Sequence, residues 1–249
     1  MSYRNTITSS LLIKHFTTKR AFSCTSAILK PSLRINAVAP NFKAETTEGP
    51  IDFHNFIGNN WAVLFSHPAD FTPVCTTELG AFAKLKPEFD KRNVKLIGLS
   101  AESIDSHKKW IQDIKDVTAG LNPSKPFPFP IIGDVKKEVA LLYDMVDEEG
   151  FQKLQKGQPV ATIRSVFVID PSKKIRLTFT YPASCGRNTA EVLRVIDALQ
   201  KADSKGVVTP INWIEGQDVI IPPTVSDADA AKKFGDFKTV KPYLRFTKA

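Results

Sequence analysis

The hydrophobic residues of the chain form short continuous runs that alternate with longer stretches of spaced apolar positions. Five runs rich in β-branched and aromatic residues predict strands: residues 61–66, 94–100, 131–132, 161–170 and 175–181. Four stretches with apolar residues at intervals of three and four predict helices, which open at Thr72, Ser103, Val135 and Asn188. This alternation predicts an α/β fold in which helices cover both faces of a parallel sheet.

Proline and polar residues mark the breaks between these elements. Pro87 is expected to interrupt the helix that opens at Thr72, and residues 171–174 predict a hairpin turn between the last two strands. Residues 144–160 are polar and contain glycine, so they are expected to form a loop. Residues 51–53 predict a short additional strand. After residue 205 the chain becomes a series of short pieces separated by prolines, which indicates a change in organisation.

The chain has 249 residues, of which 42% are hydrophobic, enough for one large core or a core with a small appendage. Its formal net charge is +8, but residues 1–44 carry seven basic side chains and no acidic one, which leaves about +1 for the rest. Because the basic charge is concentrated in a leader, it gives no support to nucleic-acid binding by the remainder of the chain.

Residues 1–30 have the composition of a mitochondrial transit peptide. They are rich in Ser, Thr, Lys and Arg, lack acidic residues, and scatter apolar residues that a helix would gather on one side. The longest apolar run, residues 11–13, is too short for a membrane span or a secretory signal, so no stable membrane insertion is predicted. Arg20 predicts cleavage after Phe22 and import into the mitochondrial matrix. The alternative is a disordered basic tail, and Cys24 is assigned no role.

The segment from His67 to Glu78 joins a predicted strand to a predicted helix and carries the main chemical signal. Thr72 and Pro73 are typical of a helix start, because threonine can cap free backbone N–H groups and proline has no N–H to leave unpaired. This register places Cys75 in the first turn, where the helix dipole and unpaired N–H groups favour a nucleophilic thiolate. The alternative is an inert buried thiol, the commoner role of a lone intracellular cysteine.

Pro68, Thr72 and Cys75 have the spacing Pro-x-x-x-Thr-x-x-Cys, which resembles the active-site signature of the peroxiredoxins. The longer string is similar to the one-cysteine branch, the peroxiredoxin 6 subfamily of the AhpC/TSA family. Further similar segments extend the resemblance over residues 33–249: residues 92–97, 127–132, 164–169, 181–182 and 186–188. The resemblance implies a thioredoxin-like fold with peroxiredoxin insertions over residues 33–204. It also implies a small C-terminal domain, residues 205–249, that contacts the partner in a homodimer.

The resemblance further implies a thiol peroxidase that protects mitochondria against oxidants. Cys75 would attack hydrogen peroxide, organic hydroperoxides or peroxynitrite and become a sulfenic acid. Negative charge builds on the leaving oxygen during this attack, so a fixed cation and hydrogen-bond donors should lower the barrier. In the implied site, Arg164 lies beside the thiolate, and the Thr72 hydroxyl and the Cys75 N–H are the hydrogen-bond donors. Pro68 belongs to the signature, and Glu78 and Arg187 are supporting residues. His67 is either a wall of the pocket or a structural histidine.

A sulfenic acid on Cys75 must be reduced to complete the cycle. No cysteine follows Cys185, so the resolving cysteine of two-cysteine relatives has no counterpart. An external thiol is expected instead, from glutathione with glutaredoxin or from a thioredoxin system. Cys185 stands where similar proteins have threonine or valine, and it is either a tolerated small residue or a second thiol near the pocket.

Other classes of function fit less well. A thiol-dependent chaperone would use the same Cys75, but it should need assembly beyond a dimer and should tolerate loss of Arg164. The four histidines and three cysteines show no close ligand spacing and no Cys-x-x-Cys pair, so no metal, cofactor or dithiol chemistry is predicted. Some one-cysteine relatives hydrolyse phospholipids, but Asn60 and Ser172 occupy the serine and aspartate positions here. Only His54 remains, so no lipase activity is expected.

Overall fold

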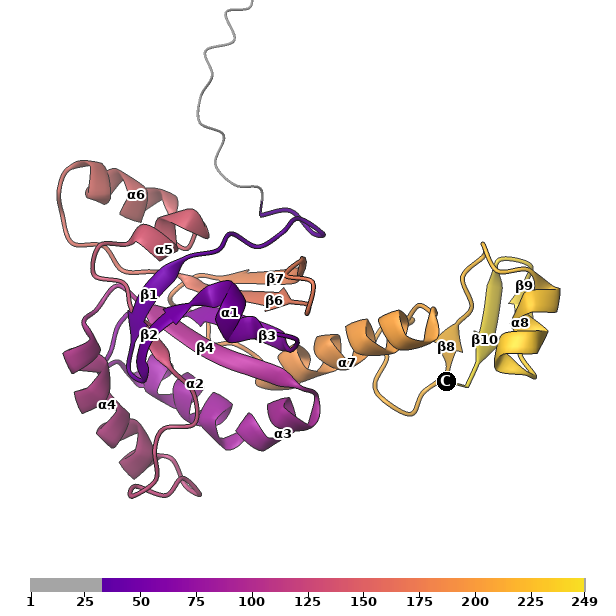
Figure 1. The fold of residues 1–249 in the computed structure, drawn as a ribbon, viewed down its shortest axis with the longest axis horizontal. Helices are drawn as coiled ribbons and strands as arrows, with labels where there is room; N and C mark the ends of the chain where they lie inside the picture. Colours follow the sequence, from indigo (N-terminus) through magenta and orange to yellow (C-terminus); the bar gives the residue numbers. More distant parts are fainter. Residues whose placement is uncertain (1–32, 249) are drawn as a thin grey trace, which may run out of the picture. The chain divides into compact units, whose positions relative to one another are not determined.

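The computed structural model describes residues 33–248, so the predicted leader and Cys24 lie outside the described residues (Figure 1). Its main sheet is built from β1 (Lys43–Thr46), β2 (Gly49–Asp52), β3 (Trp61–Ser66), β4 (Val94–Ser100), β5 (Ile131–Gly133), β6 (Arg164–Ile169) and β7 (Ile175–Tyr181). The strand order is β2-β1-β5-β4-β3-β6-β7. The helices that accompany it are α1 (Phe53–Ile57), α2 (Pro73–Lys84), α3 (Lys86–Lys91), α4 (Ile104–Val117), α5 (Glu138–Leu142), α6 (Glu148–Gln155) and α7 (Thr189–Lys205).

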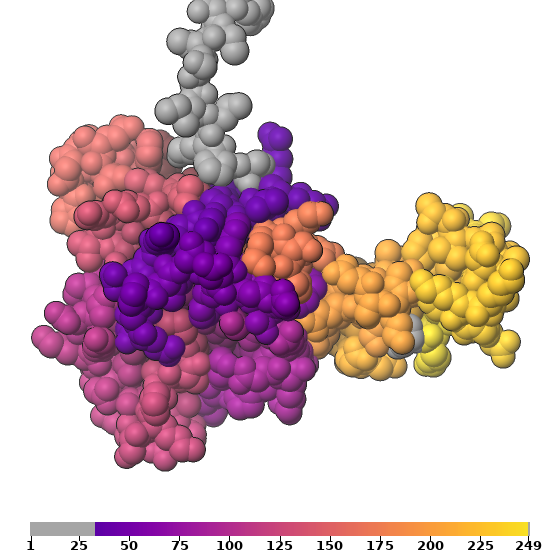
Figure 2. Space-filling model, in the orientation of Figure 1, coloured from indigo at the N-terminus to yellow at the C-terminus, as the bar shows by residue number. Residues whose placement is uncertain are grey.

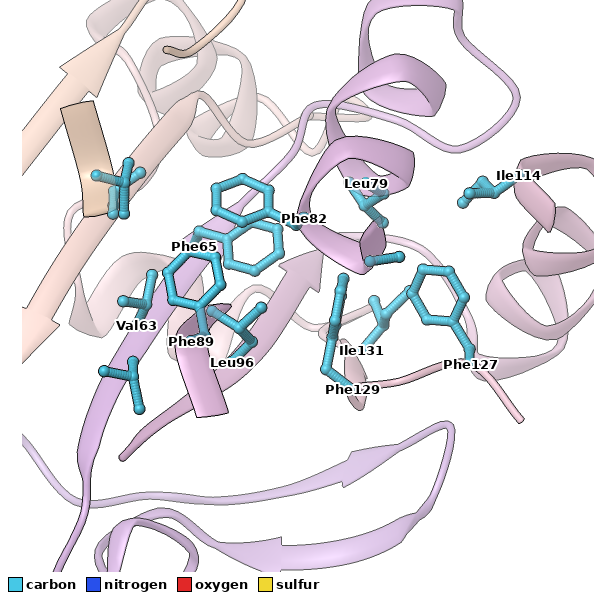
Figure 3. Packing of buried hydrophobic residues seen from close by; sticks show 14 of the residues in the cluster. Val63, Phe65, Leu79, Phe82, Phe89, Leu96, Ile114, Phe127, Phe129 and Ile131 are labelled. Atoms are coloured by element: carbon cyan, nitrogen blue, oxygen red, sulfur yellow. The ribbon is translucent and has the colours of Figure 1, made fainter. Parts of the chain in front are cut away.

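β3 is buried along its whole length, and its side chains alternate between two hydrophobic clusters. Val63 and Phe65 belong to one cluster, and Ala62 and Leu64 belong to the other. Because alternate side chains of a strand point to opposite faces, both faces of the sheet are covered, as the continuous apolar run predicts. Figure 3 shows the first cluster, in which the rings of Phe65 and Phe82 stack with centroids 4.4 Å apart.

The strands predicted at residues 61–66, 94–100 and 175–181 are confirmed, and β6 and β7 form the predicted hairpin. The prediction of a parallel sheet is only partly right. β3, β4 and β5 run parallel, whereas β6 pairs antiparallel with β3 and β1 pairs antiparallel with β5. The predicted strand at residues 51–53 is one arm of an unpredicted hairpin, β1–β2, and it ends at Asp52 because that side chain caps α1 by accepting from Asn55 N.

The helix predicted to open at Thr72 is interrupted near Pro87, as expected. α2 ends at Lys84, and Pro87 lies in the first turn of α3, where it lacks only an N–H that would be unpaired anyway. The helix predicted from Val135 begins only at Glu138. Lys137, the residue before Glu138, has a left-handed φ of 59°, so a helix cannot run continuously through it.

The loop predicted for residues 144–160 contains a helix, so that prediction is wrong. α6 lies at the surface, where its segment is visible in Figure 2, and its exposed residues are polar apart from Phe151. The side chain of Asp147 caps it by accepting a hydrogen bond of 2.7 Å from the Gly150 N–H. The helix predicted to open at Asn188 is confirmed: Asn188 caps α7, which runs to Lys205 and is followed by Gly206 with a φ of 63°.

The C-terminal residues form a second, three-stranded sheet. It comprises β8 (Val219–Ile220), β9 (Lys238–Lys241) and β10 (Leu244–Thr247) in the order β8-β10-β9, together with α8 (Asp227–Phe234). The fully buried Trp213 packs with Val207 and Val219 in a small cluster of their own. Arg194 in α7 donates to the carbonyl of Trp213 at 3.1 Å. Within residues 33–248, no helix has the length and hydropathy needed to cross a bilayer.

Candidate active site

The junction between β3 and α2 presents Cys75 in the first turn of the helix, with its side chain fully buried. Pro73 takes the first helical position, but the predicted cap by the Thr72 side chain is wrong. The Thr72 hydroxyl instead donates to the carbonyl of Ala69 at 2.8 Å. A carbonyl only accepts, so the hydrogen of this hydroxyl is engaged while its oxygen can still accept.

Arg164 begins β6 and reaches across to α2. Its Nη1 donates to Cys75 Sγ at 3.2 Å, and both side chains are buried. Its Nε and Nη2 donate to the carbonyl of Ala183 at 3.0 and 2.8 Å, which fixes the plane of the guanidinium. A buried guanidinium this close to sulfur can stabilise negative charge that develops in the site during a reaction. The structure therefore brings together two residues that lie 89 positions apart in the sequence.

Glu78 lies one turn after Cys75 in α2 and accepts hydrogen bonds from two arginines. Its Oε2 is 2.8 Å from Arg164 Nη1 and 2.7 Å from Arg187 Nη2, and its Oε1 is 2.7 Å from the Arg187 backbone nitrogen. Burial alone would raise the pKa of Glu78, but the hydrogen bonds and charge of Arg187, with the charge of Arg164, lower it overall. An ionised carboxylate thus holds both guanidinium groups, and that of Arg164 contacts the sulfur.

The loop before Thr72 is strained and tightly held. Phe71 has a φ of 54°, a left-handed conformation that is unusual for a bulky residue, and this residue is 56% exposed. Pro68, a residue of the signature, is partly buried at the start of this loop. Between them, the Asp70 backbone N–H donates to Glu102 Oε2 at 2.6 Å. Contacts of this kind keep the strained backbone in place.

His67 and His107 both bind Asp70, although the histidines show no close spacing in the sequence. His67 Nε2 lies 2.8 Å from Asp70 Oδ1, and His107 Nδ1 lies 2.7 Å from Asp70 Oδ2. Neither Asp70 nor His107 is predicted from the sequence as a site residue. A signal for His107 did exist, because it shares the buried face of α4 with Trp110 and Ile114, at intervals of three and seven residues.

Comparison with known proteins agrees with this site. The profile of the AhpC/TSA family matches residues 35–178, and that of the C-terminal domain of 1-Cys peroxiredoxin matches residues 198–236. The chain belongs to the AhpC/TSA family. It is 66% identical over 220 residues to Peroxiredoxin PRX1, mitochondrial, of Saccharomyces cerevisiae, which covers 88% of this chain and 82% of that protein. It is 48% identical over 221 residues to human Peroxiredoxin-6, with 86% of this chain and 97% of that protein covered.

Solved structures of peroxiredoxins have the same fold. A yeast mitochondrial 1-Cys peroxiredoxin superposes with a TM-score of 0.78 at 62% identity, over 88% of this chain and 100% of that one. A mutant of Peroxiredoxin 6 from Arenicola marina gives 0.80 at 43% identity, over 87% and 98%. The predicted thioredoxin-like fold with a small C-terminal domain is confirmed. The chain is a 1-Cys peroxiredoxin, a thiol peroxidase of the peroxiredoxin 6 subfamily.

Cys185 of this peroxiredoxin is exposed, whereas Cys75 is buried, and both are free thiols. Cys185 follows two residues after Ala183, whose carbonyl binds Arg164. The next residue, Gly186, lies close to α2. A Cβ added at this glycine would be 3.6 Å from a side-chain carbon of Val74, the residue before Cys75. The loop that carries Cys185 therefore borders the Cys75 site, and its role as a second thiol stays a prediction.

The buried ring of His67 predicts an acid-sensitive step in the stability of this peroxiredoxin. Desolvation lowers the pKa of His67 from 6.5 to about 4, against the opposing effect of its hydrogen bond to Asp70. The folded state therefore binds fewer protons than the unfolded state between these values, and stability falls as the pH drops through this range. The expected loss is about 3 kcal/mol, measured by urea unfolding between pH 7 and pH 4.

The matched variants for this prediction are His67→Gln and His54→Gln. His54 is a partly buried histidine that contacts the carbonyl of Ala39 at 2.8 Å, away from Asp70. His67→Gln should flatten the pH dependence in this range, and His54→Gln should keep the slope of the wild type. An equally steep slope in the His67 variant would contradict the assignment of the step to His67.

Proposed function

We propose that this peroxiredoxin reduces hydrogen peroxide and organic hydroperoxides through Cys75. The thiolate attacks one peroxide oxygen, so that an S–O bond forms while the O–O bond breaks. The attacked oxygen stays on sulfur as a sulfenic acid, and the other leaves and takes up a proton to give water or an alcohol. Sulfur is oxidised by two electrons and the peroxide is reduced by two.

The observation that carries this proposal is the contact of 3.2 Å between Arg164 Nη1 and Cys75 Sγ in a buried site. The guanidinium stabilises the thiolate before the attack and the negative charge on the leaving oxygen during it. Glu78 keeps the guanidinium in place. The role of Thr72 differs from the predicted donor role, because its hydrogen is bound to Ala69 and its oxygen is the atom available to accept from the peroxide hydroxyl.

We expect a thiol from outside the chain to reduce the sulfenic acid on Cys75, because the resolving cysteine of two-cysteine relatives has no counterpart in the sequence. The yeast mitochondrial relative is described as resolving its thiol via glutathione/thioredoxin systems. We expect the same two systems to serve here: glutathione with glutaredoxin, or thioredoxin with its reductase.

The test is peroxide-dependent NADPH oxidation, coupled through glutathione reductase or thioredoxin reductase. Wild type should turn over with at least one system, and Cys75→Ser should turn over with neither. Turnover that survives in Cys75→Ser would remove Cys75 from the mechanism. A wild type that consumes peroxide with neither reductant would contradict the proposed source of electrons.

Import into mitochondria predicts a shortened N-terminus. The basic, acid-free leader and the mitochondrial name of the yeast relative support import into the matrix. N-terminal sequencing of protein from isolated mitochondria should then begin at Ser23, after cleavage at Phe22. An intact Met1 on mitochondrial protein would contradict this prediction.

The domain division and the dimer belong to the same proposal. A thioredoxin-like domain over residues 33–204 and a C-terminal domain over residues 205–249 are consistent with the two separate sheets and with the match of the C-terminal profile. We expect the C-terminal domain to contact the partner subunit of a homodimer. Light scattering should give twice the mass of the mature chain, and loss of residues 205–249 should weaken this association.

A further inference from the structure

A cavity of 280 Å³ lies between the C-terminal ends of α2 and α4, the start of α3 and the loop that joins α4 to β5. Leu121 and Phe127 belong to its apolar wall, and both pack in the first hydrophobic cluster, where Figure 3 shows Phe127. None of the residues that line the cavity takes part in the Cys75 site. Its volume is near the lower end of the roughly 300–1,000 Å³ typical of small-molecule sites, which indicates a small ligand.

Lys115, in the last turn of α4, also lines this cavity and is only 8% exposed. Its Nζ donates to the carbonyl of Pro123 at 2.7 Å and, over a longer distance of 3.4 Å, to the carbonyl of Lys125. Both partners are neutral, and they take up two of the three hydrogens of the ammonium group. Because a buried charge without an opposite charge is costly, the position is suited to an anion that also accepts the third hydrogen.

Two more lysines, Lys86 and Lys125, line the same cavity. Lys86 pairs with Asp90 in α3, and its charge also acts on Glu48, so its positive charge is partly compensated. Lys125 is exposed. No acidic residue lines the cavity in the part of the chain that the structure describes, so the positive charges of Lys115 and Lys125 border it without a carboxylate beside them.

We propose that this cavity binds a small amphiphilic anion. Its acidic head group, a carboxylate or a phosphate, contacts Lys115 and Lys125, and its short apolar body contacts Leu121 and Phe127. The head group supplies the negative charge and the acceptor that the Lys115 ammonium lacks. The apolar body removes the cavity wall from water, which favours such a ligand over a free inorganic anion. This site is separate from the proposed reaction at Cys75 and does not depend on it.

A purely structural role for Lys115 is the alternative. The side chain joins the end of α4 to residues 123–125, and a cation in the last turn of a helix interacts favourably with the helix dipole. These contacts explain a lysine at this position, but they do not explain the adjacent cavity or the second lysine, Lys125, in its lining. Only the ligand site predicts that the wild-type protein distinguishes an acid from an alcohol with the same apolar body.

The binding test is methyl NMR of the full chain labelled with ¹³C in its leucine methyl groups, because Leu121 lies in the cavity wall. Hexanoate, hexyl phosphate, 1-hexanol and inorganic phosphate are titrated separately. The Leu121 resonances should shift in a saturable way with at least one of the two acids, with a dissociation constant of about 1 mM. Hexanol lacks the head group and inorganic phosphate lacks the apolar body, so each should bind about tenfold more weakly. The tighter of the two acids identifies the head group.

Lys115→Met removes the buried charge and keeps an unbranched side chain of similar length. It should weaken binding of the tighter acid about tenfold and leave the weak binding of hexanol unchanged. Lys109→Met is the matched control, because Lys109 is an exposed lysine of the same helix that does not line the cavity. This control should bind all four compounds as the wild type does.

Three results would overturn the proposal. One is the absence of a saturable shift at Leu121 in the wild type with either acid, a measurement that needs no variant to fold. Another is hexanol that binds the wild type as tightly as both acids, which would leave Lys115 with its structural role alone. The third is unchanged binding of the acids in a folded Lys115→Met. A wild-type Cys75 that peroxide does not oxidise would instead contradict the proposed function, whatever binds in this cavity.

Discussion

Replacement of Arg164 by Gln is expected to slow the oxidation of Cys75 by hydrogen peroxide by about 10²–10³-fold. The guanidinium donates to Cys75 Sγ at 3.2 Å and lies where charge develops on the leaving oxygen. Gln has no charge to favour the thiolate, and its shorter side chain cannot also bind Glu78 and Ala183. Rapid-quench oxidation followed by mass analysis of the Cys75 peptide gives the rate constant directly.

Arg176→Gln is the matched control for this prediction. Arg176 lies in β7 and is also a partly buried arginine with carboxylate partners, Asp170 and Asp203, but none of its contacts is in the Cys75 site. Its variant should react at the rate of the wild type. Equal slowing in both variants would indicate a general loss of structure. An unchanged rate in Arg164→Gln would contradict the role of the guanidinium in the reaction.

Replacement of Glu78 by Gln is expected to lower the free energy of unfolding by about 3–5 kcal/mol, because it leaves two buried cations without their shared carboxylate. Arg164 and Arg187 both bind Glu78 Oε2, at 2.8 and 2.7 Å. The pKa of Glu78 is lowered in the folded state, so its contribution is present above the ordinary carboxyl pKa and is lost as the pH falls through the folded value. Urea unfolding at neutral and acidic pH measures both effects.

Glu88→Gln is the control for this second prediction. Glu88 also binds two cations, Lys91 and Arg92, but it does so at the surface in α3. Exposed ion pairs contribute little, so the unfolding midpoint of this variant should stay near that of the wild type. A Glu78→Gln protein as stable as the wild type, with an unchanged response to pH, would show that the buried carboxylate is not needed to hold the two arginines.

The sequence predicts those strands of the fold whose composition is determined by burial alone. β3 and β4 are buried on both faces, so their sequences are apolar except for Lys95 and the serine that ends each strand, and their bounds are confirmed. α6 was missed because a short surface helix needs only a cap and a narrow apolar stripe, which its polar sequence conceals. The antiparallel pairing of β6 with β3 depends on the topology of the whole sheet, and the local sequence of a strand does not specify its direction.

The residues of the candidate site also differ in whether the local sequence or the folded structure reveals them. Cys75, Thr72 and Pro68 form a local signature that the sequence displays directly. The position of Arg164 follows only from the pairing of β6 with β3, and that of His107 from the packing of α4 against the loop after β3. Asp70 is the clearest example: it lies within the signature, but its importance depends on His107, 37 residues further along the chain.

The measurement that tests the central claim most directly is the intact mass of wild type and Cys185→Ser after one equivalent of hydrogen peroxide, with dimedone present to trap sulfenic acid. We predict that both proteins carry one dimedone adduct, on Cys75, and that neither forms a disulfide. A wild type that escapes the trap and loses two hydrogens to a disulfide, while Cys185→Ser is labelled, would contradict this account, because Cys185 would then be the residue that resolves Cys75.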